Sequence, residues 1–147
     1  MYQRILVATD GSELSDKAVQ SATSLALLTG ATLVILNVVP HYPRSYMGGA
    51  LPSDAVTVKQ IESQWTGTAQ ALVDSIKAAA ATQGVTAEAL VTKSDLVSEA
   101  VIAAAKKHKC DLIVMASHGR KGIKRMLLGS ETQHVLTHSH IPVLVLR

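Results

Sequence analysis

Strand-like and helix-like segments alternate along the whole chain, and this alternation constrains the fold more than any other feature. Short apolar runs typical of buried strands are separated by stretches whose apolar residues follow helical spacing. The expected strands are residues 5–8, 32–39, 86–92, 111–116 and 141–146, and the expected helices begin near Ser12, Ser53-Asp54, Ser94-Asp95 and Ser130. Strict alternation predicts a parallel sheet wound by right-handed crossovers. We therefore expect one α/β domain over residues 1–147, doubly wound, with five strands in the order 3-2-1-4-5.

Composition narrows the class of protein. Hydrophobic residues make up 48% of the chain and aromatic residues only 3%, without Phe, so the core must consist of Val, Ile, Leu and Ala. The formal net charge of +3 is small for a non-specific nucleic-acid binder, so no nucleic-acid partner is expected. The apolar stretch 25–39 is interrupted by Thr29-Gly30 and is too short to span a membrane. A single cysteine, Cys110, excludes an internal disulfide and fits a reducing, cytoplasmic compartment.

Capping and turn residues predict where the helices begin and end. Ser12 is expected to cap the first helix, and Gly30 to end it in the left-handed conformation. Ser94-Asp95 is expected to cap the third helix, and Ser130 with Gln133 forms a capping box at the start of the fourth.

Residues 40–53 differ from their surroundings, because they contain three prolines and a Gly-Gly pair. The segment is too long for a simple connection. Its role stays open between a mobile flap or partner contact and a disordered surface excursion.

Residues 109–132 are the best functional lead. The apolar run 112–116 is followed by Ser117-His118-Gly119, then by a basic loop with Gly122, and then by Gly129-Ser130 at an expected helix start. Glycine permits close backbone approach, and a helix N-terminus presents N–H groups, so the stretch predicts a phosphate site. Alternatively, the glycines only turn the chain and Ser130 only caps the helix. The basic loop, either phosphate-neutralising or merely solvated, contains Arg120, Lys121, Lys124 and Arg125.

Asp10 follows the first strand and shares the expected site. In doubly wound sheets ligands bind outside the carboxyl ends of strands where the winding reverses. The strand order puts Asp10 and Ser117-His118-Gly119 in that one crevice. The carboxylate can bind a ribose hydroxyl, bind Mg²⁺ or stabilise the Asp-Gly turn, and the sequence does not choose among these roles.

Three histidines near the chain's end have spacing that can hold a metal: His134, His138 and His140. Because neither Cys nor a carboxylate clusters beside them, solvent-facing histidines are the favoured interpretation, and no metal site is expected there. No nucleophile, base and orienting partner can be assembled around His118, so little or no catalytic turnover is expected.

Three sequence blocks, in order, resemble the universal stress protein family across essentially the full length. They are Ile-Leu-Val-Ala-Thr-Asp-Gly-Ser at 5–12, Asp-Leu-Ile-Val-Met-Ala-Ser-His-Gly at 111–119, and Leu-Leu-Gly-Ser at 127–130 with Ile-Pro-Val-Leu-Val at 141–145. The resemblance implies a cytoplasmic stress-response protein, usually a homodimer, with an adenine-nucleotide alpha-hydrolase-like fold. One branch of the family binds ATP and carries Gly, two residues, Gly, nine residues, then Gly-Ser or Gly-Thr.

In this chain Ala116 stands at the first glycine of that motif, and Gly119 and Gly129-Ser130 match the rest. By the resemblance, Asp10 and Val38 line the adenosine side, and Gly119, Gly129 and Ser130 hold phosphates. The cofactor implied is ATP or another adenine nucleotide, with Mg²⁺ on Asp10 as an option. The full nucleotide-binding set is Ala8, Thr9, Asp10, Val38, Met115, Ala116, Ser117, His118, Gly119, Arg120, Gly129, Ser130, Glu131 and Thr132.

The last strand is an apolar edge without the charges that normally protect edges, which predicts pairing with a second copy of the chain. The expected interface residues are Pro142, Val143, Leu144, Val145 and Leu146. The sequence thus favours a nucleotide-binding stress regulator that acts as a homodimer. The alternatives are a dimeric interaction module that binds no nucleotide and a slow ATPase.

Overall fold

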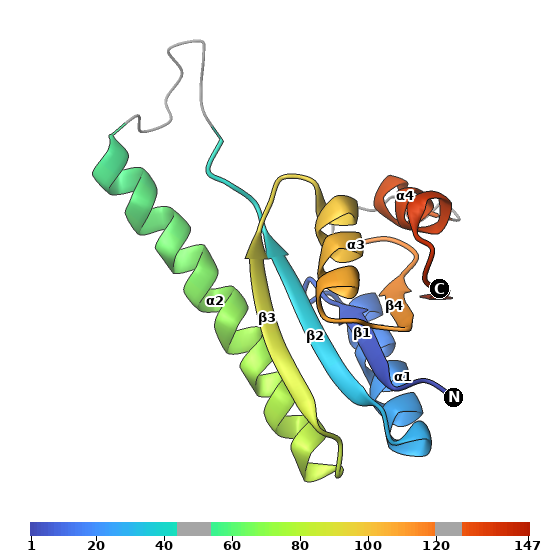
Figure 1. Ribbon diagram of the computed structural model, residues 1–147. Helices are drawn as coiled ribbons and strands as arrows, with labels where there is room; N and C mark the ends of the chain where they lie inside the picture. Colours follow the sequence, from blue (N-terminus) through green and yellow to red (C-terminus); the bar gives the residue numbers. More distant parts are fainter. Residues whose placement is uncertain (44–53, 120–127) are drawn as a thin grey trace.

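The computed structural model describes residues 1–43, 54–119 and 128–147. The expected strands and helices are present in the expected chain order (Figure 1). They are β1 (Arg4–Ala8), α1 (Glu13–Thr29), β2 (Thr32–Val39), α2 (Ala55–Thr82), β3 (Ala87–Lys93), α3 (Val97–Lys107), β4 (Leu112–Ala116), α4 (Ser130–His138) and β5 (Val143–Leu146). Residues 44–53, and the basic loop with Arg120, Lys121, Lys124 and Arg125, lie outside the described residues.

The strands form one parallel sheet in the order β3-β2-β1-β4-β5, so the predicted topology is confirmed. Leu6 in β1 pairs with Val34 of β2 on one side and with Ile113 of β4 on the other. Because β1 leads to β2 while its other neighbour is β4, the winding reverses between β1 and β4.

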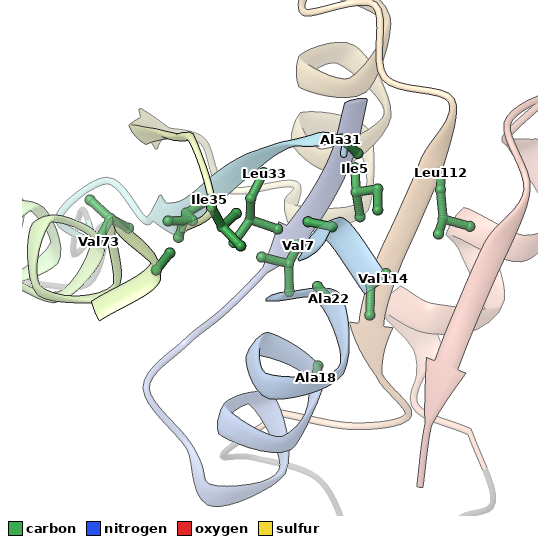
Figure 2. Close-up of a cluster of buried hydrophobic side chains, with 13 residues drawn as sticks. Ile5, Val7, Ala18, Ala22, Ala31, Leu33, Ile35, Val73, Leu112 and Val114 are labelled. Carbon is green, nitrogen blue, oxygen red and sulfur yellow. The ribbon is translucent and has the colours of Figure 1, made fainter. Parts of the chain in front are cut away.

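Helices cover both faces of the sheet, and each face has its own core. On one face α1 and α2 pack on alternate residues of β1, β2 and β4, among them Ile5, Val7 and Val114. Figure 2 shows Ala18 and Ala22 of α1 directed toward this layer, and such small side chains let the helix lie close to the sheet. On the other face α3 and α4 cover the intervening strand residues. Within the described residues, no helix is both long and apolar enough to cross a membrane.

The predicted limits of α1 are confirmed. The Ser12 side chain accepts a hydrogen bond from the Ser15 N–H at 3.3 Å, which caps the helix. Gly30 ends it with φ of 74°, a left-handed conformation that favours glycine, and donates its N–H to the Ala26 carbonyl.

The predicted cap of α3 is wrong. The helix begins at Val97 with Leu96 at the N-cap position, and Asp95 instead accepts hydrogen bonds from the N–H and ring Nδ1 of His41 at 2.8 and 3.1 Å. These bonds, led by the backbone N–H, hold the pKa of Asp95 below its ordinary value. The partner lies 54 residues earlier in the sequence, and a local capping rule takes no account of it.

Cys110 lies buried at the entry to β4 and is a free thiol. Burial raises the pKa of the Cys110 thiol to about 11, because a thiolate would be poorly solvated there. The side chain therefore behaves as a small packing residue at neutral pH.

Candidate functional site

The chain leaving β1 makes a tight turn at the carboxyl edge of the sheet. The Thr9 N–H donates to the Leu36 carbonyl at 2.9 Å, which extends the pairing with β2 by one residue. The Ser12 N–H donates to Asp10 Oδ1 at 2.9 Å, and Gly11 between them has a left-handed φ of 79°. The backbone thus holds Asp10 at the carboxyl edge of the sheet, with its side chain exposed.

Gly119, which follows β4, lies directly against this carboxylate. A Cβ atom placed on Gly119 would lie 2.7 Å from Asp10 Oδ2, closer than real Cβ atoms approach an oxygen. Two loops separated by more than a hundred residues therefore meet where the winding reverses, as the strand order predicts. Only a glycine permits this approach without displacing Asp10.

The second loop is anchored on both sides of Ser117. The Ser117 N–H donates to the Leu146 carbonyl at 2.7 Å, and the Ser117 carbonyl accepts from the Gly129 N–H at 2.7 Å. A Cβ on Gly129 would lie 3.3 Å from that carbonyl oxygen and 3.5 Å from the His118 Cα. Gly129 is therefore pressed against the backbone that follows β4, which places the start of α4 at the same edge of the sheet.

The predicted capping box at α4 is wrong. Gly129 is the N-cap, with φ of −71° and ψ of 160°, and Ser130 is already the first helical residue. The Gln133 side chain donates to the Leu128 carbonyl at 3.1 Å and does not cap the helix. The physical reason is the bond between Gly129 and Ser117, which fixes the helix start one residue earlier.

This start leaves the helix N-terminus without a side-chain acceptor among the described residues. First-turn N–H groups have no partner within their own helix. At α4 they can meet an anion, which the helix dipole also favours. The arrangement fits phosphate oxygens approaching Gly129 and Ser130.

Thr132 and Glu131 make contacts within the protein that hold α4 in place. The buried Thr132 hydroxyl lies 2.9 Å from the Ala116 carbonyl and 3.1 Å from the Ser117 carbonyl. Glu131 Oε2 accepts the Ser98 N–H at 2.7 Å and so caps α3, which has no side-chain cap of its own in the described chain. Sequence reasoning missed the role of Ser98, because no local pattern connects it to a glutamate 33 residues later.

The remaining predicted residues lie around the same edge. Ala8 and Val38 are partly buried and pack on the α3–α4 core, which contains Met115. Ala116 is 9% exposed, and strand alternation puts its methyl group on the same face as Val114, beneath α1. Ser117 Oγ lies 3.2 Å from His118 Nδ1. Arg120, the other predicted ligand, lies outside the described residues.

Within residues 1–43, 54–119 and 128–147, no three His, Cys, Asp or Glu side chains gather in a group that could hold a metal ion. Asp10 is therefore not part of a ready-made multi-ligand metal site in those segments. A cation there would have to be shared with a bound phosphate.

Comparison with known proteins assigns the family. The model of the universal stress protein family matches residues 1–147. The chain belongs to this family. Universal stress protein YxiE of Bacillus subtilis is 32% identical over 149 residues, and the match covers all of both chains.

Solved structures of other universal stress proteins share the fold. UspA from Lactobacillus plantarum has a TM-score of 0.86 at 24% identity, with 99% of this chain and 98% of that chain covered. A universal stress protein solved in complex with cAMP has a TM-score of 0.71 at 28% identity, with 99% and 97% covered. The second relative shows that a member of the family holds an adenine nucleotide.

Proposed function

We propose that this universal stress protein binds an adenine nucleotide in the crevice between β1 and β4 and acts as a regulator with little or no turnover. The observation that carries the proposal is the approach of Gly119 to Asp10, 2.7 Å from a Cβ position to Oδ2, beside the open N-terminus of α4. A site that combines a carboxylate, two closely packed glycines and a helix N-terminus without a side-chain cap among the described residues suits a ligand with hydroxyls at one end and phosphates at the other.

The proposal divides the site by chemistry. The phosphates meet Gly119, Gly129 and Ser130, and the first-turn N–H groups of α4 that follow Gly129 supply the hydrogen bonds. The Gly129 N–H itself is donated to the Ser117 carbonyl, so Gly129 contributes by permitting close backbone approach. Asp10 accepts ribose hydroxyls or holds Mg²⁺ against the phosphates, and Val38 lines the adenosine side. Ala8, Thr9, Met115, Ala116, Ser117, His118 and Arg120 complete the lining. Glu131 and Thr132 act on the ligand indirectly, through the position of α4.

The relative solved with cAMP supports the ligand class, because it is 28% identical over nearly the whole chain. Its ligand contains both adenosine and a phosphate, which are the two parts that the proposed division of the site requires.

The test is calorimetric titration of ATP, ADP, AMP and cAMP into purified protein, each with and without Mg²⁺. We expect one nucleotide per chain and a rise in melting temperature, since a ligand that binds only the folded state stabilises it. Asp10→Ala separates the two roles of the carboxylate: loss of Mg²⁺ dependence indicates metal binding, and equal loss for all nucleotides indicates the ribose. No heat and no thermal shift at millimolar nucleotide would refute the proposal.

Ala116 favours a second candidate function, an interaction module that binds no nucleotide. Its methyl group stands where the ATP-binding branch has a glycine, and it is buried at the carboxyl end of β4. Ala116→Gly discriminates between the two functions. A gain of ATP binding from nothing would favour the module, whereas binding by both forms supports the first proposal.

The proposal includes a homodimer formed through β5. This strand lies at the end of the sheet order, with β4 on one side, and Leu144 is 41% exposed. An unprotected apolar edge satisfies its backbone groups by pairing with another strand. A monomeric mass in sedimentation at micromolar concentration would contradict the dimer.

A cytoplasmic location is also proposed, and the free thiol of Cys110 supports it.

A further inference from the structure

The start of α3 carries two exposed apolar residues at the carboxyl edge of the sheet. Leu96, the N-cap, is 56% exposed, and Val97, the first helical residue, is 37% exposed. Leucine is among the poorest N-cap residues, because its side chain accepts no hydrogen bond from a first-turn N–H group. Neither helix capping nor burial in the core accounts for this leucine. A residue that breaks a local rule in this way is expected at a functional site.

Two hydrogen bonds tie Leu96 to the end of β2. The Leu96 N–H donates to the Ser94 hydroxyl oxygen at 3.1 Å, and the Ser94 N–H donates to the Val39 carbonyl at 2.9 Å. Val38, which the proposed function puts on the adenosine side, directly precedes Val39 in the chain. Leu96 is therefore held at the adenosine end of the proposed nucleotide site.

A third hydrogen bond ties the chain after Val97 to the phosphate end of the same site. The Ser98 N–H donates at 2.7 Å to Glu131 Oε2, and Glu131 lies in the first turn of α4. Figure 1 shows α3 and α4 side by side on this face of the sheet. Between the ends of β2 and β4 lie two strand spacings, about 10 Å, which an extended nucleoside phosphate can bridge.

We propose that Leu96 and Val97 form an apolar surface on which the base of the bound nucleotide packs, and that they set a preference for a purine over a pyrimidine. This inference rests on the proposed nucleotide-binding function. The planar base is the most apolar part of a nucleotide, and its contact with aliphatic side chains removes apolar surface from water. A purine buries more of that surface than the smaller pyrimidine does. Neither residue belongs to the nucleotide-binding set predicted from the sequence.

The test is calorimetric titration of ATP, CTP and inorganic tripolyphosphate into the native chain, Leu96→Ser and Val97→Thr. We expect Leu96→Ser to lower the affinity for ATP about fivefold or more, because roughly half of a leucine side chain no longer contacts the base. Val97→Thr keeps the shape of the side chain and should lower it about twofold. The preference for ATP over CTP should fall in both variants. Tripolyphosphate has no base, so its affinity should stay unchanged.

The melting temperature of Leu96→Ser separates loss of a contact from damage to the fold. Serine is a good N-cap, so this variant should melt at the native temperature or above it while it binds ATP more weakly. Leu28→Ser is the matched control, because Leu28 is 84% exposed in the last turn of α1, at the opposite edge of the sheet. It should bind ATP like the native chain.

The outcomes distinguish this inference from the proposed function. If the native chain binds ATP and Leu96→Ser binds it equally well, the assignment of the apolar surface is overturned and nucleotide binding stands. Equal losses for ATP and tripolyphosphate would also overturn it, because the substitution would then act on the phosphate end. An unchanged preference for ATP over CTP has the same consequence. A native chain that binds no ATP would refute the proposed function, and this inference with it.

Discussion

Two helices begin at the carboxyl edge of neighbouring strands, and their N-termini are built differently. After β1, the Ser12 side chain caps α1, and Asp10 accepts the Ser12 N–H. After β4, α4 begins at Gly129 and has no side-chain cap among the described residues. The two helices occupy related places in the topology, yet a side chain accepts a first-turn N–H group at the start of α1, whereas no side chain of the described residues caps the start of α4.

The difference shows how a phosphate site can be assigned on one side of a crevice. A serine at the N-cap accepts a first-turn N–H and competes with an anion for that donor. A glycine at the N-cap offers no such acceptor and permits close approach of the backbone. Phosphates are therefore expected at α4, and the loop after β1 contributes the carboxylate of Asp10.

Gly119→Ala should have the largest effect on binding. The new Cβ would lie 2.7 Å from Asp10 Oδ2, so the carboxylate must move out of the crevice. Because Asp10 is exposed, we expect nucleotide affinity to fall at least about tenfold while the free energy of unfolding changes by less than about 1 kcal/mol. Calorimetric titration and urea unfolding measure the two quantities. Unchanged affinity would break the assignment of Gly119 to the site.

Gly129→Ala should destabilise the fold. Its Cβ would lie 3.3 Å from the Ser117 carbonyl oxygen, which is backbone and cannot swing aside, and alanine is a poor N-cap. We expect the free energy of unfolding to fall by about 1–2 kcal/mol. Gly67→Ala in α2 is the control, because it has nothing within 4 Å. It should stabilise by about 0.5–1 kcal/mol. The same sign for both variants would contradict the close packing of Gly129.

Ser12→Ala and Ser130→Ala test the two N-termini directly. Ser12 caps α1, so its loss should cost about 1 kcal/mol of unfolding free energy with a small effect on nucleotide binding. Ser130 is the first helical residue and caps nothing, so its loss should leave stability within about 0.5 kcal/mol and lower nucleotide affinity. Urea unfolding and titration of both variants give the comparison. If the two substitutions lowered the free energy of unfolding equally, Ser130 would be acting as a cap of α4, as the capping-box prediction states.

Glu131→Gln should have the smallest effect. The amide oxygen still accepts the Ser98 N–H, but a negative charge is removed from the N-terminal ends of α3 and α4. We expect a stability loss of about 0.3–1 kcal/mol and a slightly higher affinity for phosphates. Glu99→Gln is the matched control, since Glu99 lies in the first turn of α3. Glu99→Gln should lower the free energy of unfolding by a similar amount without raising the affinity for phosphates. An equal rise in affinity would mean that the effect of Glu131→Gln comes only from the change in net charge.

The strands and their order were predictable because their signal is local and repeated. The run from Thr32 to Val39 is apolar enough to be recognised as a buried strand, and the observed strand has the same limits. Alternation with helices then predicts the crossovers, and the crossovers predict the crevice beside Asp10. Each step needed only the sequence and the handedness of the chain.

Two helix starts were mispredicted for one physical reason. A serine or aspartate near a helix start caps it only if no stronger partner is near, and Asp95 and Ser130 lie where other contacts decide. Asp95 is bound by His41, and the start of α4 is set by the bond from Gly129 to Ser117. These partners come from other elements, so a local rule cannot include them.

The sequence by itself determined the alternating elements, the sheet order and which loops face each other across the crevice. Only the tertiary structure decided the distances within it: Gly119 against Asp10, Thr132 on the Ala116 carbonyl, and Glu131 on the N-terminus of α3. The physical reason is the separation along the sequence over which each kind of interaction acts. Periodicity and turn chemistry act over a few residues, whereas these contacts join residues that only the packing of helices on the sheet brings together.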